Sequence, residues 1–277
     1  MNRCQVWIKN TQNQQKKDNK AMWISILGCS GGIGPGNRTT SILIDDDILL
    51  DAGSGVGDLQ LQQMSRIRHV FISHSHLDHI AFLPFLVDSI FSQIKQPIQV
   101  YGLPETIKAL RDHIFNWVIW PDFSELPTKD NGVMSFNEVS AGDVITIDQR
   151  SITVVPVEHI VPGIGFIVTS ENSKHFAFSG DTATNDSLWH ALNQLDNLEA
   201  LMIEAGYPNS MEKLGTLAKH YTPRSLAKDL KKLKHKPHLL ISHIKPGLEI
   251  QISEDLHQEL KDYQLTCIKS GDSLQFD

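Results

Sequence analysis

Short apolar runs rich in β-branched residues recur along the chain, and polar turns separate them. Runs of this length and composition predict buried β-strands. A first series covers residues 23–27, 41–44, 48–50, 69–72, 98–101, 144–147 and 152–157. A second series covers residues 165–168, 175–178, 201–203, 239–241 and 265–268. The chain is therefore expected to form extended sheets.

Helical patterns lie between several of these runs. Residues 104–115 carry their apolar side chains on one helical face, which predicts an amphipathic helix. Thr222 and Pro223 combine a capping residue with a first-turn proline, so a second helix is expected from there to about Lys234. Strands mixed with helices in this way predict an α/β fold in which stacked sheets are covered by helices.

The composition is that of an ordinary globular chain. The 277 residues are 40% hydrophobic and 21% charged, enough to bury a large core. Because no linker, low-complexity tract or internal repeat interrupts the pattern, residues 21–277 are expected to form a single domain. Residues 1–20 are polar and rich in Asn, Gln and Lys, so they are expected to be a loose tail and lack the apolar core of a signal peptide.

Charge and cysteine content restrict the partners and the compartment. A formal net charge of -7 argues against a protein that wraps a long polyanion, but not against a small anionic substrate. The three cysteines are far apart in the sequence, which fits a reducing cytoplasm. The apolar segment 80–94 is interrupted by Pro84 and Asp88, so no membrane insertion is expected.

The most informative stretch is residues 74–79, which read His-Ser-His-Leu-Asp-His and follow the apolar run 70–73. A buried strand would hold this turn rigidly. His74 and His76 can aim their imidazoles at one metal ion, while Asp78 and His79 turn toward a second. Imidazole and carboxylate ligands suit zinc first, with manganese or iron as alternatives.

Three later positions repeat the arrangement of an apolar strand that ends in a possible ligand. They are His159 after residues 154–157, Asp181 after residues 176–180, and His243 after residues 239–242. Any one of them alone would more often be a structural residue, because His and Asp commonly end strands. Together with the histidine-rich turn, they predict one metal site at a shared sheet edge.

This order of motifs resembles the metallo-β-lactamase superfamily. The resemblance implies an αββα sandwich of two stacked mixed sheets flanked by helices, with two divalent metal ions. It implies one metal held by His74, His76 and His159, a second held by Asp78, His79 and His243, and Asp181 as the bridge. A hydroxide shared by the two metals would attack the substrate, which makes Asp78 and Asp181 catalytic residues. Asp51 resembles the aspartate of the family's early turn beneath the metals.

Within the superfamily, the segments 115–122, 203–209, 217–223 and 242–246 resemble class II cyclic-nucleotide phosphodiesterases. That resemblance implies hydrolysis of 3′,5′-cyclic AMP or cyclic GMP to the 5′-nucleotide, and it suggests a homodimer. It also assigns substrate binding to His220, Glu204 and Asn116. His220 would contact the phosphate or donate a proton to the leaving oxygen, with Glu204 orienting it. The structural alternative for His220 is a histidine that caps a helix end.

Three other functions stay open. A tRNA 3′-processing endonuclease shares the metal turn but needs a basic arm for RNA. Between His79 and His159 the basic residues are outnumbered by Asp and Glu, so nucleic acid is not expected as a partner. The basic residues there are Lys95, Lys108, Arg111, Lys129 and Arg150. The others are a non-catalytic metal-binding member of the family and hydrolysis of a different ester, such as a sulfate ester or a lactone.

Overall fold

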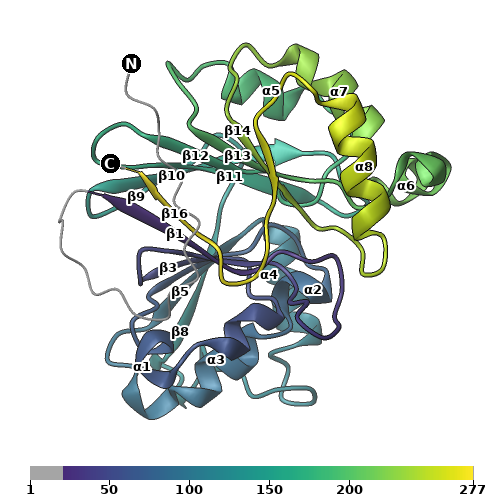
Figure 1. Ribbon diagram of the computed structural model, residues 1–277. Helices are drawn as coiled ribbons and strands as arrows, with labels where there is room; N and C mark the ends of the chain where they lie inside the picture. Colours follow the sequence, from purple (N-terminus) through teal and green to yellow (C-terminus); the bar gives the residue numbers. More distant parts are fainter. Residues whose placement is uncertain (1–20, 277) are drawn as a thin grey trace.

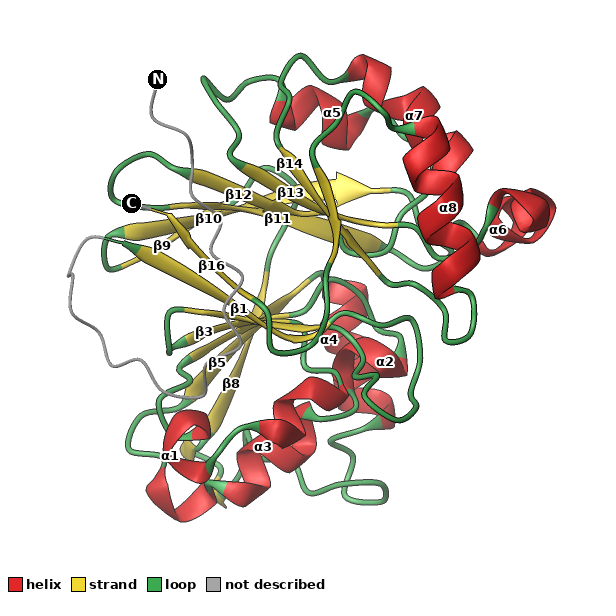
Figure 2. Cartoon of the chain, in the orientation of Figure 1, coloured by secondary structure: helices red, strands yellow, loops and turns green. Residues whose placement is uncertain are grey.

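The structure is a computed structural model that describes residues 21–276; the tail predicted for residues 1–20 lies outside them. Two seven-stranded sheets pack face to face, and helices cover both outer faces (Figure 1, Figure 2). This order of helix, sheet, sheet and helix confirms the αββα sandwich expected from the sequence. None of the helices within residues 21–276 combines the length and apolar character needed to cross a membrane.

The first sheet mixes antiparallel and parallel pairing. Its strands, in spatial order, are β16 (Ser273–Phe276), β1 (Met22–Gly28), β2 (Ser41–Ile44), β3 (Ile48–Leu50), β4 (His69–Phe71), β5 (Ile98–Gly102) and β8 (Met134–Glu138). From β3 to β8 the neighbours are parallel. The carboxyl ends of β3, β4 and β5 therefore lie at one edge of the sheet.

The second sheet has the same number of strands. In spatial order they are β15 (Leu265–Cys267), β14 (His238–Ser242), β13 (Ala200–Glu204), β12 (His175–Phe178), β11 (Gly163–Thr169), β10 (Arg150–Val157) and β9 (Val144–Ile147). The strands from β12 to β15 are parallel. Every residue of β13 and β14 is buried, as expected for parallel strands that are covered on both faces.

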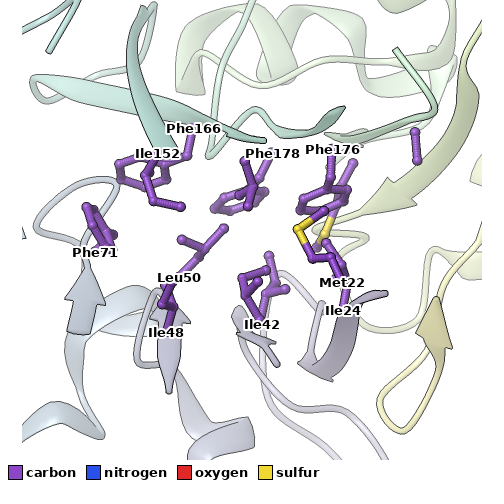
Figure 3. Packing of buried hydrophobic residues seen from close by; sticks show 14 of the residues in the cluster. Met22, Ile24, Ile42, Ile48, Leu50, Phe71, Ile152, Phe166, Phe176 and Phe178 are labelled. Carbon is purple, nitrogen blue, oxygen red and sulfur yellow. The ribbon is translucent and has the colours of Figure 1, made fainter. Parts of the chain in front are cut away.

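The main core lies between the two sheets. Leu50 and Phe71 of the first sheet face Phe166 and Phe178 of the second (Figure 3). The rings of Phe71 and Phe166 meet edge to face, with 5.7 Å between their centroids. A second apolar cluster lies between the first sheet and its covering helices, and a third lies between the second sheet and its helices.

The helices divide between the two outer faces. On the first sheet they are α1 (Leu61–Met64), α2 (Leu77–Ile80), α3 (Leu83–Ser89) and α4 (Pro104–His113). On the second they are α5 (Ser187–Leu192), α7 (Pro223–Asp229) and α8 (Glu249–Glu259). Helix α6 (Glu212–Ala218) projects from the side of the molecule next to α8 (Figure 1). A small ribbon of β6 (Pro127–Thr128) and β7 (Asn131–Gly132) precedes β8.

The predicted strand runs all fall on observed strands, whereas one helix boundary was wrong. The α-helix that starts at Pro223 ends at Asp229 and passes into a 3₁₀ turn over Leu230–Lys232, short of Lys234. Leu230 and Leu233 are both buried. Because a 3₁₀ turn superposes residues three apart, the tighter turn lets both leucines reach the core.

Candidate metal centre

The histidine-rich turn is positioned by β4, a strand buried at Val70 and Phe71. The chain leaves β4 at Phe71, bends at Ser73 and Ser75, and enters α2 at Leu77. His74 and His79 are buried, with 1% and 0% of their surface exposed. The turn from strand to helix thus directs these two imidazoles inward.

The second sheet supplies the facing residues. His159 follows β10, Asp181 follows β12 and His243 follows β14, and all three are buried. Gly180, just before Asp181, has a positive φ of 61°. A Cβ atom there would lie 2.9 Å from the carbonyl oxygen of Ile164 and 3.2 Å from Ser73 Cβ, so glycine lets the Asp181 segment pass close to β11 and to the histidine-rich turn.

The seven predicted ligand residues form two groups that share Asp181. The first group is His74, His76, His159 and Asp181, and the second is Asp78, His79, His243 and Asp181. Within each group the candidate ligand atoms lie within 4.8 Å of one another. Asp181 Oδ1 is 3.2 Å from His243 Nδ1, whereas its Oδ2 is 3.4 Å from His79 Nε2 and 3.8 Å from His74 Nε2. The Asp181 carboxylate therefore stands between the groups.

The donor atoms fit metal ions. Six buried polar side-chain atoms among residues 21–276 have no hydrogen-bond partner, and three of them are His74 Nε2, His79 Nε2 and His243 Nδ1. Buried polar atoms without a partner are rare in proteins and usually indicate an ion, water or ligand. Since each of these nitrogens belongs to one of the two groups, a divalent cation in each group would satisfy them.

Metal binding requires neutral imidazole and ionised carboxylate, and four of the ligand candidates meet this requirement. Burial holds the pKa of His74 well below its usual value, and it lowers the pKa of His159 to about 4 and that of His243 to about 3. Burial would raise the pKa of Asp181, but the neighbouring His243 and His79 outweigh it and hold this pKa well below the usual value. At neutral pH these four groups are in the form that binds metal. His79 differs, because burial would lower its pKa but Asp181 and Asp51 outweigh burial and raise this pKa well above the usual value, so a metal ion would have to displace its proton.

Two further groups fix the direction of the imidazoles. Asp51 is fully buried and accepts hydrogen bonds from the backbone N–H and the hydroxyl of Ser73, both at 2.7 Å, and from His79 Nδ1 at 2.6 Å. His79 Nε2 is thereby left to face the site. His159 Nδ1 lies 3.1 Å from the carbonyl oxygen of Lys219, a residue with left-handed backbone at the end of α6. Sequence patterns gave no sign of that carbonyl contact.

His220 lies directly beside both groups. Its ring centroid is 5.0 Å from that of His159 and 5.0 Å from that of His243. Its Nδ1 is 2.6 Å from Glu204 Oε1, which also accepts from the backbone N–H of Thr182 at 3.0 Å. Burial would lower the pKa of His220, but Glu204 outweighs it and raises this pKa. The Glu204 carboxylate thus orients His220 and stabilises its charged form.

Glu204 and Asn116, the other two residues predicted to bind substrate, make hydrogen bonds within the protein. Glu204 is fully buried, and its contacts are with His220 and backbone N–H groups, which favours a positioning role. The Asn116 side chain accepts from the backbone N–H groups of Val118 and Ile119 and donates to the carbonyl oxygen of Asp112. The structure therefore shows Asn116 bound to its own loop, and substrate contact by Asn116 stays a prediction.

Behind the site, Asp229 joins segments that carry site residues. Its Oδ2 accepts from Tyr221 Oη at 2.7 Å, from Trp189 Nε1 at 3.1 Å and from the backbone N–H of Asn185 at 3.1 Å. Tyr221 is the neighbour of His220, and Asn185 Nδ2 donates to the hydroxyl of Thr182, next to Asp181. The buried Asp229 carboxylate thus ties the His220 segment to the Asp181 segment.

We expect Asp229→Ala to lower the free energy of unfolding by about 3 kcal/mol, because it leaves buried donors without an acceptor. Urea unfolding followed by circular dichroism measures the change, with Asp262→Ala at an exposed turn as the control.

The contribution of Asp229 to stability should also depend on pH. Burial would raise the pKa of Asp229, but hydrogen bonds from Tyr221, Lys232 and Trp189 hold this pKa below the usual 3.8. The stabilisation is therefore present above pH 3.8 and should shrink below it. Equal midpoints for Asp229→Ala and wild type at pH 7 would contradict this role.

Known proteins resemble this chain over most of its length. A Yersinia pestis protein named "Probable 3′,5′-cyclic-nucleotide phosphodiesterase" is 28% identical over 280 residues, which cover 83% of this chain and 80% of the relative. Ribonuclease Z of Methanosarcina mazei is 27% identical over 168 residues, which cover 58% of this chain and 52% of that protein. The crystal structure of unliganded yeast PDE1 superposes with a TM-score of 0.77 at 20% identity, over 93% of this chain and 100% of that one, which shows a shared fold.

A family model settles the family. The model described as "Beta-lactamase superfamily domain" matches residues 47–244. That span begins just before β3 and ends just after β14, so it contains both ligand groups as well as Glu204 and His220. The sequence resemblance is confirmed, and the chain belongs to the β-lactamase superfamily, with the metallo-β-lactamase fold.

Proposed function

We propose that this protein is a dinuclear metal-dependent phosphodiesterase that hydrolyses 3′,5′-cyclic nucleotides to 5′-nucleotides. The observation that carries the proposal is the pair of ligand groups that share Asp181, with His220 directly beside them. The relative named as a cyclic-nucleotide phosphodiesterase, which matches 83% of this chain, supports the substrate. We propose zinc as the metal, with manganese or iron as alternatives.

The proposal gives each residue a separate task. Divalent ions held by the two groups would supply positive charge that lowers the pKa of water and stabilises the phosphate as its charge rises. In the reaction, water oxygen bonds to phosphorus and the bond to the 3′ oxygen breaks. His220, held through Nδ1 by Glu204, would give its Nε2 proton to that leaving oxygen. Asp51 would keep His79 in its liganding orientation.

The side chains that neighbour the ligands favour a small substrate. Leu77 lies between His76 and Asp78 in the sequence, and Ile160 follows His159; both are exposed. A long RNA is bound mainly through basic side chains that contact its phosphates. Exposed apolar side chains instead suit the flat faces of a single base. This supports a cyclic nucleotide over a precursor tRNA.

The test measures the metal content of purified protein by plasma mass spectrometry and its hydrolysis of cyclic AMP and cyclic GMP. A precursor tRNA serves as the second substrate. We expect two divalent ions per chain and release of the 5′-nucleotide. Cleavage of the tRNA without hydrolysis of either cyclic nucleotide would replace the proposal with RNA processing. Metal without any activity would favour the non-catalytic alternative.

A further inference from the structure

Lys245 lies at the edge of the metal centre, two residues after His243. Its ammonium nitrogen Nζ is 3.3 Å from His243 Nε2 and 3.0 Å from the carbonyl oxygen of Gly31. The side chain is partly buried. His243 Nε2 is also 3.9 Å from Asp78 Oδ2, so the positive charge of Lys245 lies beside the second ligand group, at the ring nitrogen of His243 other than the one nearest Asp181.

Within residues 21–276, no ion pair joins Lys245 to a carboxylate. Among residues 21–276, Lys219 pairs with Glu158 and Lys232 pairs with Asp229, whereas the contacts of Lys245 Nζ are a carbonyl oxygen and an imidazole. Neither of these cancels a full positive charge. A partly buried ammonium without a counter-charge is unfavourable, and a bound anion removes that penalty.

A glycine-rich loop, residues 28–36, holds the lysine in this direction. The Gly31 N–H donates to the carbonyl oxygen of Ile244 at 3.0 Å, and the His243 N–H donates to that of Cys29 at 2.6 Å. A Cβ atom on Gly31 would lie 2.6 Å from the His243 carbonyl oxygen and 3.0 Å from Lys245 Cδ. Since only glycine allows this contact, the loop packs directly on the lysine stem and fixes the charge in advance.

The His243 imidazole, which Lys245 contacts, also contacts His220, the residue expected to donate a proton. The rings of His220 and His243 stack with centroids 5.0 Å apart and 17° between their planes. Lys245 reaches His243 through Nε2. His220 and Lys245 thus both adjoin His243, which places both beside the second ligand group.

We propose that Lys245 is a substrate-binding residue that pairs with the phosphate of the substrate and makes the site select anionic esters over neutral ones. The inference rests on the proposed function, because it takes the substrate to be a phosphodiester. It extends that function by placing the choice between a phosphate ester and a lactone at one side chain. The ammonium contributes an ion-paired hydrogen bond to a non-bridging phosphate oxygen.

The first experiment measures the binding of inorganic phosphate to the zinc-loaded protein by isothermal titration calorimetry. We expect Lys245→Met to weaken binding by about 10- to 100-fold, the range for hydrogen bonds to charged groups. Lys245→Arg, which keeps the charge, should stay within about threefold of wild type. Lys174→Met is the matched control, because Lys174 is a partly exposed lysine paired with Glu199 at the other end of β12.

The second experiment compares an anionic and a neutral ester, bis(4-nitrophenyl) phosphate and 4-nitrophenyl acetate. Lys245→Met should lower kcat/KM for the phosphate about 10-fold or more and leave the acetate unchanged. Metal content is measured for each variant. Phosphate affinity equal to wild type in metal-loaded Lys245→Met would overturn the inference, as would equal losses in Lys245→Arg and Lys245→Met. A wild type that cleaves no cyclic nucleotide but binds phosphate through Lys245 would overturn only the proposed function.

Discussion

Asp181→Ala is expected to abolish metal binding at both groups and to reduce hydrolysis of a cyclic nucleotide by about 1000-fold or more. Asp181 belongs to both groups, and its two oxygens lie 3.2 Å from His243 Nδ1 and 3.4 Å from His79 Nε2. Its loss removes a ligand from each ion and leaves the first group with imidazoles alone. The charge supplied by the ions accounts for several kcal/mol of the barrier, which corresponds to a rate change of this size.

Plasma mass spectrometry of the dialysed protein measures the metal, and release of 5′-nucleotide measures the rate. Asp130→Ala, at an exposed position far along the chain from the ligand residues, is the control and should behave as wild type. Circular dichroism establishes that the variant is folded. A folded Asp181→Ala protein that retains two ions per chain would show that Asp181 is not the shared ligand.

His220→Ala should behave differently, since it slows turnover but leaves the metals bound. His220 lies beside His159 and His243 but belongs to neither ligand group. Loss of a general acid lowers kcat by about 100- to 10,000-fold. Glu204→Gln should lower kcat by a smaller factor, because it leaves His220 in place and weakens the bond that orients it.

Steady-state kinetics and metal content together measure this effect. His190→Ala replaces an exposed histidine on α5 and serves as the matched control. A substrate with a good leaving group, such as 4-nitrophenolate, needs less proton donation and should lose less rate in His220→Ala. Full activity of His220→Ala with normal metal content would exclude the role of acid, and equal losses with both leaving groups would favour phosphate binding.

The sequence predicted the strands and the ligand groups because their signals are local. Residues 74–79 place four candidate ligands in one turn, and the buried strands around them read as apolar runs. Strand β16 was missed because Ser273–Phe276 is short and pairs with β1 at the other end of the chain. Helix α8 was missed because Ile250 is exposed while Ile252 and Leu256 are buried, so its apolar positions do not follow one face.

Contacts that support the ligands could not be predicted, since they depend on how distant segments pack. The Lys219 carbonyl that meets His159 is a backbone group, which every residue carries. Asp229 reads as an ordinary residue near a helix end, and only the folded chain brings Trp189 and Tyr221 to its carboxylate. Sequence reasoning named the residues that the fold brings together in the two groups, while the hydrogen bonds behind those residues required the structure.

The division of each ligand group between the two sheets links metal binding to the closing of the sandwich. His74 and His76 follow a strand of the first sheet, whereas His159 and Asp181 follow strands of the second. An ion in this group is therefore a cross-link between the two layers, and the group does not exist while the layers are apart. By thermodynamic linkage, the free energy of metal binding adds to the free energy that stabilises the packing of the two sheets against each other. Any variant that loosens the packing between the sheets should lose metal before it loses secondary structure.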